Sequence, residues 1–131
     1  MSEMKAFDNF EKALSQLEQF LSYKVEDNRD RAGVIQAFEF TFEQAWKAIQ
    51  KHCSSEGVEV RSPREAFEEL LSLGLVPWES EEGLRSIIDD RNLTSHTYKE
   101  ATAEEVFKRI QLKHLPLLKS ILVALQPKGE S

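Results

Sequence analysis

Apolar residues recur along the chain in steps of three and four, which is the period of a helix with one buried face. No segment shows the alternation of apolar and polar residues that is typical of a strand. The first predicted helix precedes the turn at residues 24–30, and its apolar face is made of Phe7, Phe10, Leu14, Leu17 and Leu21.

The second predicted helix begins after Asn28, a residue type that caps helix starts, and runs to about residue 53. Its buried stripe is expected to contain Ile35, Phe38, Phe42, Ala45, Trp46, Ile49 and Cys53. Val34 and Phe40 lie off this stripe, so we expect the helix to bury two faces, one of which can be a contact between subunits.

A short third helix is indicated by signals at both of its ends. Ser62 is followed by Pro63 at the first helical position and by Glu65 at the third, a pattern that starts helices. Gly74 can adopt the left-handed conformation that ends one.

Two more helices follow. The fourth begins near residue 80 and is expected to face inward with Leu84, Ile87, Ile88 and Leu93. The last opens at a capping box of Thr102 and Glu105, and Pro116 inside it should remove one backbone hydrogen bond and kink the helix.

These segments predict an all-α fold, an up-and-down antiparallel bundle of four to five helices. At 131 residues the chain is expected to form one domain over residues 1–126, followed by a flexible tail at 127–131.

Composition narrows the class of protein. Hydrophobic residues make up 40% and charged residues 31%, as in ordinary globular proteins, and no apolar run approaches 18 residues. A single cysteine leaves no disulfide and no thiol cluster for a metal, so we expect a cytoplasmic protein without a metal or other cofactor. The net charge of −6 argues against a broad nucleic-acid surface, and it leaves room for a small basic site.

Candidate chemistry is concentrated in "RNLTSHTYKE", residues 91–100. Arg91 offers a cationic fork suited to a phosphate, and His96 can exchange a proton near neutral pH, so the pair can cleave RNA without a metal. Asn92 and Ser95 can support them, and the Tyr98 hydroxyl can accept a modification. Five helical positions span about 140° around the axis, so Arg91 and His96 converge only if the helix ends between them or a two-fold dimer joins two copies.

Plainer structural roles are also open for these residues. Arg91 can pair with Asp89, Asp90 or another carboxylate, while His96 and Tyr98 cover a helix end. Asp89 and Asp90 are poor joint metal ligands because adjacent helical side chains point about 100° apart.

Two glutamates on the second predicted helix also have two interpretations. Glu43 can form an ordinary surface pair with Lys47. Alternatively, the acidic pair Glu39 and Glu43 can orient His96 or Arg91 across the bundle.

Nearly the whole chain resembles the HepT-like group of the HEPN superfamily, often called nucleotidyltransferase substrate-binding proteins. The segments that carry the resemblance are "RDRAGVIQAFEFTFEQAWKAIQ", "SPREAFEELLSLGLV" and "RSIIDDRNLTSHTY". The last holds the family motif R-x4-H-x-Y without departure, as Arg91, His96 and Tyr98.

The resemblance implies a homodimeric helical bundle with the motifs lining a shared cleft, in which Arg91 and His96 carry metal-independent endoribonuclease activity and the protein acts as a toxin. It also implies a small nucleotidyltransferase partner of the antitoxin kind, encoded beside it, which can transfer AMP to Tyr98. A second role implied for the family is a non-catalytic subunit that presents a nucleotide or substrate to the partner. RNA or a nucleotide is then the expected ligand, with no DNA and no membrane. The chain is not itself expected to be a nucleotidyltransferase, because it has no Gly-Ser turn and no predicted strand.

Overall fold

The computed structural model describes residues 2–96 and 99–127, and their regular structure is entirely helical. Six α-helices account for most of it, with 3-10 turns η1 and η2 and a π-helical turn η3 between them. In chain order the elements are α1 (Glu3–Ser22), α2 (Asn28–Ser55), α3 (Pro63–Ser72), η1 (Trp78–Ser80), α4 (Glu81–Leu93), η2 (Thr94–His96), α5 (Glu100–Arg109), η3 (Ile110–His114) and α6 (Leu115–Leu125).

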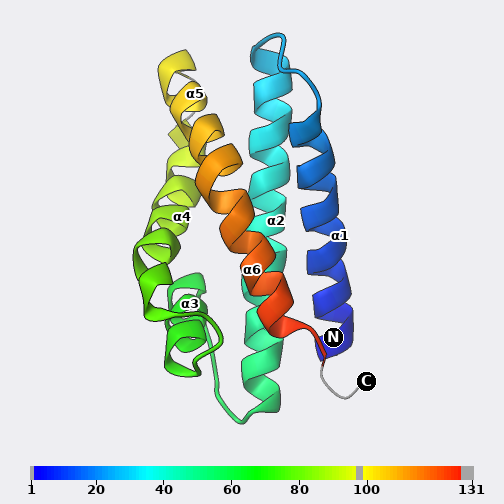
Figure 1. Cartoon of the computed structure of the whole chain (residues 1–131), viewed down its shortest axis with the longest axis vertical. Coiled ribbons are helices and arrows are strands. Elements are labelled where there is room, and N and C mark those ends of the chain that lie inside the picture. Colours follow the sequence, from blue (N-terminus) through cyan, green and yellow to red (C-terminus); the bar gives the residue numbers. More distant parts are fainter. Residues whose placement is uncertain (1, 97–98, 128–131) are drawn as a thin grey trace.

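The helices run up and down along the long axis of the bundle (Figure 1). α1 and α2 are antiparallel and form the most extensive helix pair. α4 returns in the direction of α1, and the continuous run of α5, η3 and α6 descends obliquely across the other helices, while the short α3 packs against α2 and α4. The predicted all-α up-and-down bundle is confirmed. None of the described helices is long and apolar enough to cross a bilayer.

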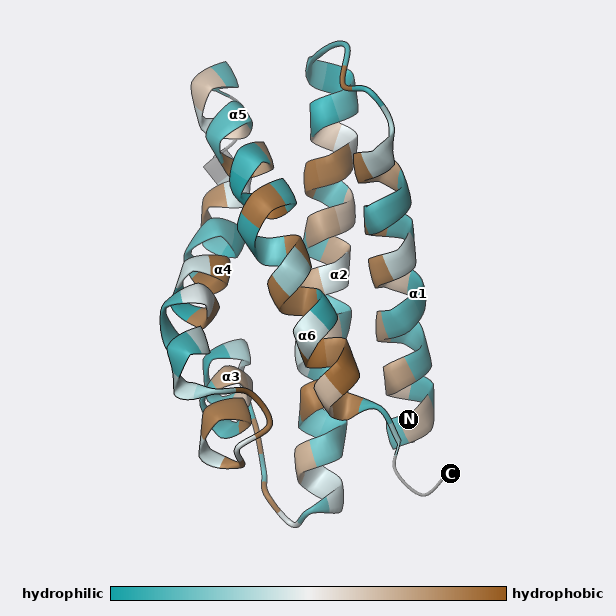
Figure 2. Cartoon of the chain, in the orientation of Figure 1, coloured by the Kyte–Doolittle hydropathy of each residue, from teal (hydrophilic) through white to brown (hydrophobic). Residues whose placement is uncertain are grey.

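The core lies where the predicted apolar faces meet. In Figure 2 brown hydrophobic segments alternate with teal hydrophilic ones along the helices. Its largest fully buried apolar side chains are Phe10, Leu17, Phe38, Phe42, Ile49, Phe67, Leu70, Ile87, Ile110, Leu118 and Ile121. Val34 belongs to this core, whereas Phe40 is 54% exposed on the outer side of α2.

Of the three N-terminal helix caps predicted from the sequence, one is observed and two are not. Ser62 caps α3 as predicted, because its Oγ accepts a hydrogen bond from the Glu65 amide at 3.2 Å. α2 is capped by Asp27, not Asn28, since the Asp27 carboxylate accepts from the Asp30 amide at 3.0 Å. Both residue types suit the position, so type alone could not choose between neighbours.

The start of α5 was predicted too late. The helix begins at Glu100, so Thr102 lies inside the first turn and forms no capping box. Close to Pro116, where a kink is predicted, the helix contains the π-helical turn η3, after which Pro116 occupies a first-turn position of α6. Proline there has no amide hydrogen to donate and its ring crowds the preceding turn, which a locally wider turn accommodates.

Candidate functional site

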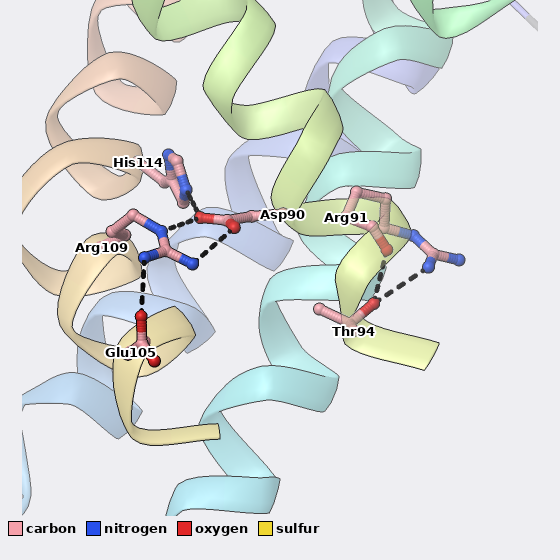
Figure 3. A network of polar contacts seen from close by, with 6 residues as sticks. All are labelled: Asp90, Arg91, Thr94, Glu105, Arg109 and His114. Atoms are coloured by element: carbon pink, nitrogen blue, oxygen red, sulfur yellow. Dashed lines mark hydrogen bonds and ion pairs between the residues drawn. The ribbon is translucent and has the colours of Figure 1, made fainter. Parts of the chain in front are cut away.

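Two successive residues near the end of α4 point in different directions (Figure 3). Asp90 points toward η3 and the end of α5, while Arg91 points toward α2. Neighbouring positions on a helix are about 100° apart, so the direction of one side chain fixes that of the next.

Asp90 is the centre of a buried polar network. Its side chain is 5% exposed, and it accepts two parallel hydrogen bonds from the Arg109 guanidinium, at 2.7 Å from Nε and 2.9 Å from Nη2. His114 Nε2 lies 2.6 Å from the same carboxylate, and the His114 ring stacks on Phe38 with centroids 5.4 Å apart. A carboxylate accepts but does not donate, so His114 Nε2 carries the hydrogen in this contact.

The network changes the acidity of its members. Burial alone would raise the pKa of Asp90, but hydrogen bonds and charge from His114 and Arg109 outweigh it and lower the pKa below its ordinary value. The pKa of Arg109 is raised, chiefly by its hydrogen bonds to Asp90. The carboxylate is therefore ionised and paired inside the bundle.

Arg91 enters a second, more open network. Its Nη1 lies 3.2 Å from Glu39 Oε2 and 3.1 Å from the Thr94 hydroxyl, and that hydroxyl lies 2.8 Å from the same Glu39 oxygen. The side chains of Arg91 and Glu39 are 31% and 33% exposed, so both can reach solvent and a ligand.

The motif histidine follows directly after this network. α4 ends at Leu93 and the 3-10 turn η2 spans Thr94–His96, so the predicted end of the α-helix between Arg91 and His96 is confirmed. The side chain of His96 and all of Tyr98 lie outside the described residues.

The predicted supporting residues do not join the Arg91 network. Asn92 and Ser95 are exposed, and the Ser95 hydroxyl donates to the Asn92 backbone carbonyl at 3.0 Å. Their observed contact is with each other rather than with Arg91.

The sequence and fold of the whole chain match one protein family. Residues 5–127 match the family described as nucleotidyltransferase substrate binding protein like. The chain belongs to this family, the HepT-like group of the HEPN superfamily. A crystal structure of a protein from Thermus thermophilus has the same fold, with a TM-score of 0.83, 34% identity and coverage of 90% of this chain and 99% of that one. None of the curated proteins compared with the chain matches it.

The contacts in the structure decide between the alternatives that the sequence of this HepT-like chain left open. Glu39 contacts Arg91 across the bundle, whereas Glu43 accepts a hydrogen bond from the Trp46 indole at 3.0 Å instead of pairing with Lys47. Arg91 pairs with another carboxylate, Glu39, as the structural alternative allowed, whereas Asp90 pairs with Arg109. No group of three or more metal-ligating side chains occurs within residues 2–96 and 99–127.

Thr94, Arg109 and His114 were not predicted as parts of the site. Arg109 and His114 reach Asp90 from 19 and 24 residues away, so no local spacing signals their contact. His114 was predicted to be structural, and its complete burial confirms this.

We expect Asp90→Asn to lower the free energy of unfolding at pH 7 by about 3 kcal/mol, because a neutral amide cannot replace the buried carboxylate that accepts from both Arg109 and His114. The folded-state pKa of Asp90 lies below the ordinary 3.8, so its ionised form contributes stability above pH 3.8 that is lost as the pH falls through the folded pKa. The free energy of unfolding, measured with denaturant from pH 7 to pH 2, should therefore fall less steeply in the variant. Asp89→Asn, at an exposed neighbour, is the control and should behave as wild type. Equal stability and equal acid dependence in wild type and Asp90→Asn would contradict this account.

Proposed function

We propose that this protein is the HepT-like partner subunit of a two-component nucleotidyltransferase module and carries a metal-independent endoribonuclease site at Arg91 and His96. Membership of a family named for nucleotidyltransferase substrate binding supports the partner role. The observation that carries the ribonuclease proposal is the partly exposed Arg91, held by Glu39 and Thr94 three residues before the start of the turn that contains His96.

The chemistry of these residues suits phosphodiester cleavage. Among the described residues, the partners of Arg91 contact Nη1, so Nη2 can bind a phosphoryl oxygen. A guanidinium in that position stabilises the charge that builds on the phosphoryl oxygens in the transition state. His96 supplies a group that can transfer a proton near neutral pH. Asn92 and Ser95 remain proposed supporting residues for a bound ligand.

We further propose that the partner transfers AMP to Tyr98 and that the protein acts as a homodimer. AMP on Tyr98 would place a phosphate and a nucleoside two residues from His96, where they can occupy the site and compensate the Arg91 charge. The exposed Phe40 on the outer side of α2 supports a subunit contact on that face.

A non-catalytic binding subunit is the second candidate function. The net charge of −6 favours it, because surfaces that bind RNA gain affinity from positive charge. The pairing of Arg91 with Glu39 also favours the binding-subunit function, because it offsets the positive charge of the site.

The ribonuclease proposal predicts cleavage of a mixed RNA pool by the purified protein in EDTA. Arg91→Ala and His96→Ala should each reduce the rate by about 100-fold or more, through loss of phosphate stabilisation and of proton transfer. Arg85→Ala is the matched control, because Arg85 lies on the same helix, is exposed and pairs with Glu81. If wild-type protein of unmodified intact mass leaves the RNA whole, the binding-subunit function replaces this one.

The modification proposal predicts that the partner enzyme, with ATP and a divalent cation, adds whole AMP units to the chain. Intact-mass spectrometry should detect the gain in wild type and in Tyr23→Phe, which alters the other tyrosine, 58% exposed. The Tyr98→Phe variant should show no gain in mass. An unchanged wild-type mass, or equal labelling of Tyr98→Phe, would rule Tyr98 out as the acceptor.

A further inference from the structure

Cleavage of RNA through its own 2'-hydroxyl requires two proton transfers. One group removes the proton from the 2'-hydroxyl, and a second gives a proton to the departing 5'-oxygen. A single imidazole cannot do both in one step, because it begins either with or without the transferable proton. The ribonuclease site proposed above, on which this inference rests, therefore needs a second proton-transfer group, either His96 of a second copy of the chain or a carboxylate beside Arg91.

Glu39 is the carboxylate that meets the requirements of this second group. Its Oε2 lies 3.2 Å from Arg91 Nη1, so a phosphate bound by Arg91 would lie next to it. The same oxygen lies 2.8 Å from the hydroxyl of Thr94, the first residue of the turn that ends at His96. Its 33% exposed side chain leaves room for a ribose hydroxyl to approach.

The neighbouring carboxylates do not meet these requirements. Asp90 is buried and engaged on both oxygens by Arg109 and His114, so it cannot reach a substrate. Glu43 lies one turn along α2 from Glu39 and accepts a hydrogen bond from Trp46.

We propose that Glu39 is the general base of the cleavage reaction and that His96 is its general acid. Glu39 accepts the proton of the ribose 2'-hydroxyl while the 2'-oxygen forms a bond to phosphorus. The bond from phosphorus to the 5'-oxygen breaks, and the protonated His96 gives that oxygen its proton. The products are a 2',3'-cyclic phosphate and a 5'-hydroxyl, and exchange with water returns Glu39 and His96 to their starting protonation states.

A purely positional role for Glu39, as the acceptor that holds Arg91, is the competing assignment. Glu39→Gln separates the two roles because the amide oxygen can still accept from Arg91 and Thr94 but does not take up a proton near neutral pH. Glu43→Gln is the matched control on the same helix, at a carboxylate that contacts Trp46 instead of Arg91.

The test is RNA cleavage in EDTA by wild type, Glu39→Gln, Glu39→Ala and Glu43→Gln across pH 4.5 to 8. We expect Glu39→Gln to lower kcat by about 100-fold or more with little change in KM and to change the shape of the pH profile of kcat. Added formate should partly restore kcat in Glu39→Ala by supplying a carboxylate, and Glu43→Gln should match wild type.

Three outcomes would overturn the inference. If wild-type cleavage is lost in Arg91→Ala and His96→Ala but is retained in Glu39→Gln, Glu39 is not the base and the ribonuclease proposal stands. A raised KM with an unchanged pH profile in Glu39→Gln would assign Glu39 to positioning alone. Unmodified wild-type protein that does not cleave RNA would overturn both proposals together.

Discussion

The arrangement of this bundle depends on one buried carboxylate, Asp90. It is held by the two parallel hydrogen bonds of Arg109 and by His114, all on the continuous run from α5 through η3. A buried charge that is paired inside a low-dielectric core tolerates little displacement, because separation leaves the carboxylate without a partner and without water. The contact therefore fixes the rotation of α4 about its own axis relative to α5 and η3.

This rotation sets the direction of the functional side chain. Asp90 turns into the bundle, so the next residue, Arg91, must leave the helix about 100° away, toward α2. The same coupling occurs on α2, where Phe38 stacks on His114 and the next residue, Glu39, contacts Arg91. The core and the site are thus joined twice. Asp90 and Phe38 both contact His114 in the core, and the residues that follow them, Arg91 and Glu39, contact each other in the site. The π-helical turn contributes by carrying His114 on its inner side, two residues before Pro116.

Much of the fold could be predicted from local sequence, but the side-chain contacts of the site could not. The three- and four-residue spacing of apolar side chains identified the core faces, and Ser62 and Gly74 marked the ends of α3, because these signals act within one or two helical turns. The R-x4-H-x-Y motif pointed to Arg91 and to a helix end before His96. The partners of Asp90 come from 19 and 24 residues away and that of Arg91 from 52, so only tertiary packing brings them together. The cap of α2 was misplaced because Asp27 and Asn28 both suit the position, and the start of α5 was misplaced because the helix begins after Lys99 without a side-chain cap.

In the proposed chemistry Arg91 binds the phosphate, Glu39 takes the 2'-proton and His96 protonates the leaving oxygen. The central claim is that RNA is cleaved through its own 2'-hydroxyl at this site. The most direct measurement is the identity of the fragment ends after cleavage in EDTA, by mass spectrometry of a short defined RNA and of the same RNA with 2'-deoxyribose at the cleaved position. The account predicts 2',3'-cyclic phosphate and 5'-hydroxyl ends, and no cleavage of the deoxy-substituted strand. Fragments with 5'-phosphate and 3'-hydroxyl ends, or cleavage of the substituted strand, would contradict it.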